Sequence, residues 1–160
     1  MPAITMTPIG IVQSDRAEAI DDAWDSVAAR IAIDATQFTA DAVTGLADFS
    51  HVEVLFCFDR VPDAEIERGA RHPRGRADWP LVGIFAQRGK GRPNRLGSTI
   101  CRLKRVEGLV LHVQGLDAID GTPVLDIKPL MKGFLPRGVV REPEWAEELM
   151  RGYWCASADG

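Results

Sequence analysis

Six or seven short apolar segments, bounded by turn residues, run through this chain of 160 residues. Their length and their content of Val, Ile, Leu and Phe are typical of β-strands. They are Thr7–Val12, Ile31–Asp34, His51–Phe58, Leu81–Ala86, Ser98–Val106, Leu109–Gly115 and Pro123–Ile127. So many short strands predict a mainly β fold, a small closed or nearly closed β-barrel with a few short helices, rather than a doubly wound α/β fold.

Turns and helices fill the remaining sequence. Glu107-Gly108 and Asp120-Gly121 are typical of tight turns, and the first predicts a hairpin. Helices are expected over Ala19–Ala29, Ala40–Leu46 and Glu142–Trp154, the last because apolar residues recur at helical spacing after Pro143. Its aromatic residues Trp145, Tyr153 and Trp154 are expected to pack in the core or at a subunit interface rather than stack on bases.

Length and composition limit the class of protein. A chain of 160 residues predicts one domain, residues 1–160, with a real core. No segment resembles a membrane span or a signal peptide. Cys57, Cys101 and Cys155 have neither zinc-site nor disulfide spacing, so we expect a cytoplasmic protein without a metal. The absence of GxGxxG and GxxxxGK[ST] motifs argues against a Rossmann nucleotide site.

The net charge of −4 hides a strong segregation of charge along the chain. Residues 1–67 hold 3 basic and 13 acidic side chains, residues 68–105 hold 11 and 1, and residues 106–160 hold 5 and 9. A basic block in an acidic protein indicates a local site for an anionic ligand. The alternative is a solvated loop surface that balances the acidic first third of the chain.

The basic block contains the strings RHPRGR (71–76) and GIFAQRGKGRPNRLGS (83–98). Arginine binds phosphates and carboxylates in bidentate fashion, so these strings predict a phosphate or substrate site. The expected ligands are Arg71, Arg74, Arg92, Asn94 and Arg95. Gly89, Gly91 and Gly97 are expected to permit unusual backbone angles and close approach of a ligand.

A third string, LDAIDGTPVLDIKP (116–129), surrounds the Asp120-Gly121 turn. It is either an ordinary turn or a loop whose backbone grips an adenine or amino-acid group. Asp126 and Lys128 alternate on one strand face, where they form either an exposed ion pair or part of the catalytic machinery. Asp126 or Asp120 could accept a proton from an acceptor nitrogen.

These strings resemble the TsaA/TrmO-like family of S-adenosylmethionine-dependent methyltransferases. The family signature, roughly GVFATRSPxRPNPIGLS followed by LDGTPVLDIKPY, is similar to GIFAQRGKGRPNRLGS and IDGTPVLDIKP here. PIGIVQSD (8–15) and FSHVEVLFCFD (49–59) match the family as well, so the resemblance covers nearly the whole chain. It implies a non-Rossmann barrel, a homodimer, S-adenosyl-L-methionine as methyl donor and methylation of threonylcarbamoyl-adenosine in tRNA.

The resemblance also implies site residues. Cofactor contacts are carried over to Phe58, Asp59, Arg60, Arg88, Ser98, Asp117, Ala118, Ile119, Asp120, Gly121 and Thr122, and Phe85 is expected to pack beside them. The catalytic residues are predicted to be Asp126 and Lys128. Leu130 stands where the tRNA enzymes have tyrosine, and the family's Pro-Arg-Gln element is absent from residues 14–24. A non-catalytic S-adenosylmethionine-binding or regulatory module is therefore the alternative function.

Overall fold

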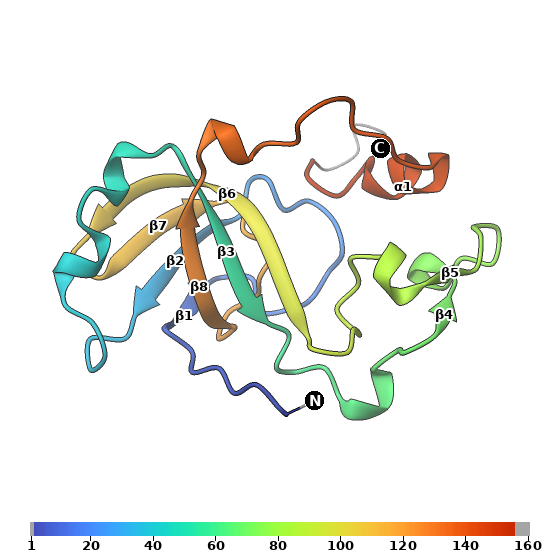
Figure 1. Ribbon diagram of the computed structural model, residues 1–160, viewed down its shortest axis with the longest axis horizontal. Coiled ribbons are helices and arrows are strands. Elements are labelled where there is room, and N and C mark those ends of the chain that lie inside the picture. Colours follow the sequence, from blue (N-terminus) through green and yellow to red (C-terminus); the bar gives the residue numbers. More distant parts are fainter. Residues whose placement is uncertain (1, 156–160) are drawn as a thin grey trace.

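The computed structural model describes residues 2–155 and is dominated by antiparallel strands (Figure 1). The strands are β1 (Gly10–Ser14), β2 (Ala28–Ile33), β3 (His51–Cys57), β4 (Ala70–Arg71), β5 (Val82–Gly83), β6 (Leu96–Glu107), β7 (Val110–Gln114) and β8 (Pro123–Pro129). Short 3-10 helices cover Ala40–Val43, Leu46–Asp48, Asp63–Glu65, Pro73–Gly75, Ile84–Ala86 and Lys132–Phe134. An α-helix, α1, covers Glu144–Met150.

Strands β1, β2, β7, β6, β3 and β8 form a closed barrel in that order, and β8 pairs with β1 to complete it. The predicted mainly β fold with a closed barrel is confirmed. Every pairing in the barrel is antiparallel. β6 and β7 form the predicted hairpin, which turns at Gly108 with φ of 57°.

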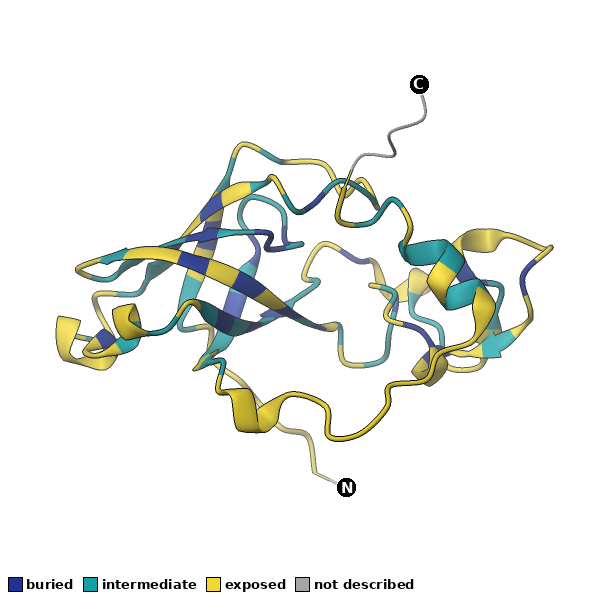
Figure 2. Cartoon of the chain, turned by 90° about the horizontal axis from the view of Figure 1, so that it is seen from above, coloured by how far each residue is buried: buried dark blue, intermediate teal, exposed yellow. Residues whose placement is uncertain are grey.

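The barrel closes around the inward-facing residues of its strands. In β3, buried and half-buried residues alternate strictly, so Val52, Val54 and Phe56 point into the core. This period of two lets one strand face fill the barrel while the other faces outward. Figure 2 shows the buried residues, in dark blue, concentrated on the barrel strands, whereas residues 131–144 after β8 are exposed.

A second region, which we call the lobe, comprises residues 58–95 and α1 and lies to the right of the barrel in Figure 1. It contains the two-stranded sheet β4–β5 and several 3-10 helices. Trp79 connects residues 58–95 to α1, because its ring lies 6.5 Å from that of Trp145 and its indole N–H donates to Glu148 at 2.8 Å. The lobe follows β3 and precedes β6, so it lies beside the end of the barrel where those strands meet.

The predicted helix over residues 19–29 is wrong, and Arg16 explains why. Its guanidinium donates to the carbonyls of Ile20, Asp22 and Ala23 at 2.6–3.1 Å, and its carbon lies 3.5 Å from the centre of the Trp24 ring. These carbonyls would be needed for helical hydrogen bonds. The segment instead wraps around one arginine before β2 begins at Ala28.

Other boundaries differ from the sequence prediction. Of the strand expected over residues 81–86, only Val82–Gly83 pairs, and the chain then turns into the 3-10 helix Ile84–Ala86. Gln87 secures this turn by donating to the carbonyls of Arg71 and Val82. The C-terminal helix ends at Met150, short of the predicted end at Trp154, and the carbonyls of Tyr153 and Trp154 accept from the backbone N–H groups of Trp24 and Asp25. The first strand starts at Gly10 rather than at Thr7.

In the part of the chain that the structure describes, no helix is long and apolar enough to cross a membrane.

Candidate functional site

Three of the singled-out segments meet at one end of the barrel, where β3 ends and β6 and β8 begin. The backbone N–H of Phe58, just after β3, donates to the carbonyl of Arg95 at 2.8 Å. Arg60 donates from its guanidinium to the carbonyl of Asp120 at 2.8 Å. Residues 58–60, 88–98 and 117–122 therefore surround a common region, although they are far apart in sequence.

The 117–122 turn is held rigidly from several sides. Asp120 accepts a hydrogen bond from the backbone N–H of Ser14 at 3.0 Å, and the N–H of Gly121 donates to the carbonyl of Val12 at 2.8 Å. Gly121 has φ of 80°, as the predicted turn requires. Ala118 and Thr122 are buried, so their side chains serve the core rather than an exposed surface.

Asp117 lies at the centre of a hydroxyl cluster. One carboxylate oxygen accepts from the Thr99 hydroxyl and the other accepts from the Tyr153 hydroxyl. Burial raises the pKa of Asp117, while the Tyr153 hydrogen bond and the nearby charge of Arg88 oppose that rise. Burial and the neighbouring Asp117 raise the pKa of Tyr153, which keeps its hydroxyl protonated as a donor.

Arg88 connects this cluster to the outside of the barrel. Its guanidinium donates to the carbonyl of Ser98 at 2.6 Å, and the Ser98 hydroxyl donates to Glu53 on β3 at 2.7 Å. Ser98 is paired with Leu55, which faces outward, whereas its neighbour Thr99 points inward and is 4% exposed. Arg88 and Ser98, both predicted cofactor contacts, are therefore in direct contact.

The arginines of residues 71–95 fall into two sets. Three in the lobe are neutralised by carboxylates: Arg74 by Asp22 and Asp21, Arg76 by Asp78 and Glu148, and Arg95 by Asp63. Arg71, Arg88 and Arg92 form no ion pair within residues 2–155. Arg92 instead donates to the carbonyl of Gln87 at 3.0 Å, which leaves its charge uncompensated.

Arg71 lies against the glycine-rich loop, and this contact corrects one expectation. Its Nε is buried and has no hydrogen-bond partner among the described residues. A Cβ at Gly89 would lie 2.5 Å from the Arg71 guanidinium, and a Cβ at Gly97 would lie 2.3 Å from the Phe56 ring. Gly89, Gly91 and Gly97 do not have positive φ angles, so the expectation of unusual backbone angles is wrong. Their lack of a side chain instead lets Arg71 and Phe56 approach the backbone closely.

Asp126 and Lys128 form an ion pair on the outer face of β8, as one of the two interpretations of the sequence expected. Asp126 also accepts from the N–H of Ile127 at 2.9 Å and is paired with Leu55 beside an irregularity in the β3–β8 register. It borders an apolar hollow of about 470 Å³ that includes Phe38, Phe49 and Pro129. The pair is thus separate from the Asp117 cluster and faces a different opening.

Other predicted site residues remain at the surface. Phe85 is 81% exposed and is not packed beside the other predicted cofactor contacts within this chain. Asp59, Arg74 and Asn94 are also exposed. Ile119, within the 117–122 turn, is half-buried.

Thr99 and Tyr153 are members of the cluster that sequence reasoning missed. Thr99 carried a signal, because it is a polar residue at an inward position of a strand, between Gly97 and Cys101. Tyr153 carried none, since its partner Asp117 is 36 residues away and on another element. Within residues 2–155, no group of three or more His, Cys, Asp or Glu side chains is arranged to hold a metal ion.

Comparisons with known proteins identify the family of this chain. The model of the tRNA-methyltransferase O N-terminal domain matches residues 20–134. The human tRNA (adenine(37)-N6)-methyltransferase is 37% identical over 102 residues, and its Escherichia coli (strain K12) counterpart is 41% identical over 98 residues. These alignments cover 64% and 58% of this chain but only 23% and 40% of those two proteins. The chain therefore spans less than half the length of either relative.

Two further comparisons cover most of this chain. A protein of Pyrococcus abyssi (strain GE5 / Orsay) named "Probable S-adenosyl-L-methionine-binding protein" is 32% identical over 160 residues, covering 98% of this chain and 84% of its own length. A crystal structure of TrmO from Pseudomonas aeruginosa has a TM-score of 0.70 and 27% identity, covering 88% of this chain and 61% of that chain. The barrel, the loops at its end and these matches show that the chain belongs to the family of the tRNA-methyltransferase O N-terminal domain.

Proposed function

We propose that this protein is an S-adenosylmethionine-dependent methyltransferase that methylates the exocyclic nitrogen of an adenosine in tRNA. The observation that carries the proposal is the convergence of residues 58–60, 88–98 and 117–122 at one end of the barrel. These are the segments that resemble the family signature. They include the uncompensated Arg88 and Arg92, and the third uncompensated arginine, Arg71, lies against the 88–98 loop. The names of the relatives support the reaction class and the tRNA substrate.

The residues at the barrel end suit a sulfonium cofactor. Asp117 offers a carboxylate to the positively charged methionine portion, and the backbone of the 117–122 turn, held by Arg60, offers polar groups to the nucleoside. Phe58 is half-buried and contacts Phe56 edge-on, with ring centres 5.3 Å apart. Ring faces and a fixed backbone are common features of nucleoside pockets. We assign the cofactor contacts to these residues together with Arg88 and Ser98.

When bound, S-adenosylmethionine supplies an activated methyl group. As the new N–C bond forms and the C–S bond breaks, the acceptor nitrogen must lose a proton. We assign Asp126 as the proton acceptor and Lys128 as its paired partner. Because this pair faces a different opening from the Asp117 cluster, the assignment requires the acceptor base to reach β8 of one copy while its nitrogen faces cofactor held by the other copy of the homodimer proposed below. Alignment of the reacting atoms contributes more to methyl transfer than a strong base does, so the proposed effect of Asp126 is moderate.

The acceptor is proposed to bind through its phosphates. Arg71, Arg88 and Arg92 keep their positive charges free of carboxylates, as phosphate contacts require. Arg74 and Arg95, also predicted as substrate ligands, are neutralised by acidic partners and contribute to this surface by shaping the lobe. Asn94 projects from the same loop.

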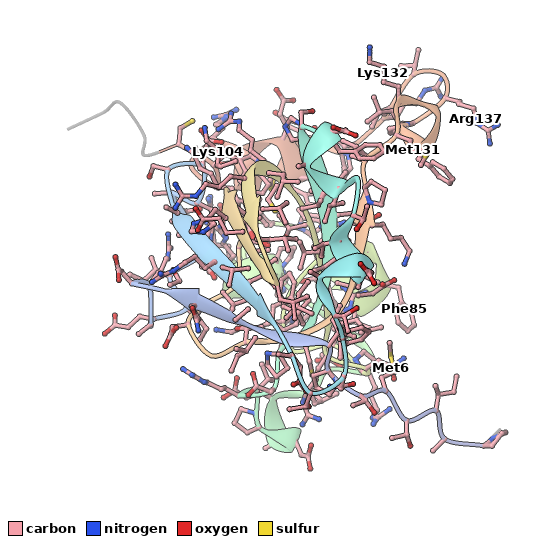
Figure 3. All side chains as sticks on the ribbon, turned by 90° about the vertical axis from the view of Figure 1, so that its left-hand side faces the viewer. Met6, Phe85, Lys104, Met131, Lys132 and Arg137 are labelled. Atoms are coloured by element: carbon pink, nitrogen blue, oxygen red, sulfur yellow. The ribbon has the colours of Figure 1, made fainter. Side chains whose placement is uncertain are left out.

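We further propose a homodimer, supported by exposed apolar side chains. Phe134, Val139 and Phe85 are each more than 80% exposed. In Figure 3, Met131, Lys132 and Arg137 project from the same side of the molecule as Phe85 and Met6, away from Lys104. Exposed apolar residues gathered on one side commonly mark a protein interface. Sedimentation of the wild-type protein and of Phe134→Glu tests this, since a dimer held by this surface would dissociate in the variant.

The second function is S-adenosylmethionine binding without catalysis, in a regulatory module. Two observations favour it: Leu130 replaces the tyrosine of the tRNA enzymes, and the P. abyssi relative that matches 98% of this chain is named only as a binding protein. Either function fits a cytoplasmic location, which the free thiols of Cys57, Cys101 and Cys155 support.

Calorimetric titration with S-adenosylmethionine, followed by transfer of labelled methyl groups to bulk tRNA, separates the two functions. Binding with incorporation supports the methyltransferase, and binding without incorporation supports the module. Asp126→Asn should bind the cofactor normally and lower turnover by about tenfold to a hundredfold. Unchanged turnover would remove Asp126 from its assigned role, and no binding by the wild type would end both functions.

A further inference from the structure

The Asp117 carboxylate is held by two hydroxyls from segments that are far apart in the sequence. Thr99 reaches one oxygen from the inward face of β6, and Tyr153 reaches the other from the segment after α1. A carboxylate has about four acceptor positions, and two hydroxyl donors fill only half of them. The two hydroxyls therefore leave acceptor positions on this carboxylate for further donors.

Tyr153 is brought to Asp117 by a defined backbone arrangement. The N–H groups of Ala23, Trp24 and Asp25 donate to the carbonyls of Gly152, Tyr153 and Trp154 at 3.0, 3.0 and 2.8 Å. The Tyr153 ring also packs edge-on against Trp154, with ring centres 5.0 Å apart. The phenol is thus fixed by three non-local hydrogen bonds, so its contact with Asp117 is built into the fold.

Asp117 makes no ion pair with Arg88, although the two residues are close. Arg88 is near enough for its charge to favour the ionised form of Asp117, yet its guanidinium donates to the carbonyl of Ser98. No ion pair between Arg88 and Asp117 forms in the described structure. Because hydroxyl donors carry no net charge, they hold the carboxylate without neutralising it. No cationic side chain of residues 2–155 pairs with this carboxylate, which leaves it free to pair with a cationic ligand.

We propose that Tyr153 is a positioning residue of the cofactor site: its hydroxyl holds the Asp117 carboxylate in the orientation that binds the cationic methionine portion of S-adenosylmethionine. This inference rests on the proposed function, and adds to it a residue outside the family signature. The C-terminal segment then completes the binding site rather than merely packing on the barrel.

Calorimetry with S-adenosylmethionine on Tyr153→Phe, Asp117→Asn and the double variant tests the inference. Tyr153→Phe keeps the ring and removes one hydrogen bond to a charged group, so we expect affinity about tenfold weaker. In the Asp117→Asn background, Tyr153→Phe should have no further effect on affinity. If Tyr153 had only a structural role, Tyr153→Phe would weaken binding in that background as well. Trp154→Phe, a matched change in the same segment that keeps Tyr153, should bind within about twofold of the wild type.

A second measurement needs no variant, because Tyr153 is the only tyrosine in the chain. Protein labelled with 13Cζ-tyrosine gives one resonance, which should shift when S-adenosylmethionine saturates the wild type. If Tyr153→Phe binds as tightly as the wild type, or if the resonance does not move at saturation, the inference is wrong while the proposed function stands. If the wild type does not bind S-adenosylmethionine, the proposed function fails and the inference fails with it.

Discussion

The barrel and the lobe are stabilised in different ways. The barrel buries continuous apolar side chains, among them Ile31, Phe56 and Leu111, each 1% exposed or less. The lobe has few buried residues and is held by arginines, whose guanidinium groups donate to carboxylates and backbone carbonyls. Stability therefore resides in the barrel, while the lobe supplies charged groups that can be changed with little cost to folding.

One pair of identical substitutions gives the largest contrast between the two regions. Phe56→Ala should lower the free energy of unfolding by about 3–5 kcal/mol, because Phe56 is 1% exposed and its loss leaves a cavity. Phe85→Ala in the lobe should change it by less than about 0.5 kcal/mol, because Phe85 is 81% exposed. Urea denaturation of both variants measures the difference, and equal losses would show that the lobe shares the core.

The next contrast compares two arginines within the lobe. Arg92 is not neutralised, so Arg92→Ala should weaken tRNA binding and reduce the slope of log K against log salt by about 0.7–0.9. Arg74→Ala should leave that slope nearly unchanged, because Arg74 already pairs with Asp22 at 2.7 Å. Filter binding over a range of salt concentrations tests both variants. The same slope for the two would contradict the division into free and neutralised arginines.

Asp117 lies where the two regions meet, and its pKa predicts a pH effect on stability. Because burial raises its pKa above 3.8, folding favours the protonated form, and stability is lost as the pH rises through the folded pKa. Asp117→Asn should therefore raise the melting temperature at pH 8. The gain should shrink below pH 4, where the unfolded carboxyl is also protonated. A melting temperature that is lower than wild type at pH 8 would contradict this.

The smallest expected effect is the loss of stability when an ion pair of a lobe arginine is removed. Arg74 and Asp22 are both partly exposed to solvent, so Arg74→Ala should cost at most about 1 kcal/mol and less at high salt. Thermal melting in low and high salt measures this. A loss comparable to that of Phe56→Ala would mean that the ion pair is essential to the fold.

The sequence predicted the barrel well because its strands are local patterns. The Val, Leu and Phe content of HVEVLFCF predicted β3, and Glu107-Gly108 and Asp120-Gly121 predicted the turns. The helix expected over residues 19–29 failed because Arg16 takes up carbonyls of that segment, an interaction that propensity does not represent. Likewise, the basic block was visible in the sequence, but the sequence did not show which of its arginines are neutralised by carboxylates.

By itself, the sequence determined the strand faces, the positions of the turns and the family signature, since each depends on residues close together in the chain. The tertiary structure alone decided which charges remain free and which groups meet at Asp117. Arg74 meets Asp22 across 52 positions, and Tyr153 meets Asp117 across 36. Such contacts are set by how the barrel closes and where the chain after α1 returns to residues 23–25, and no local pattern encodes them.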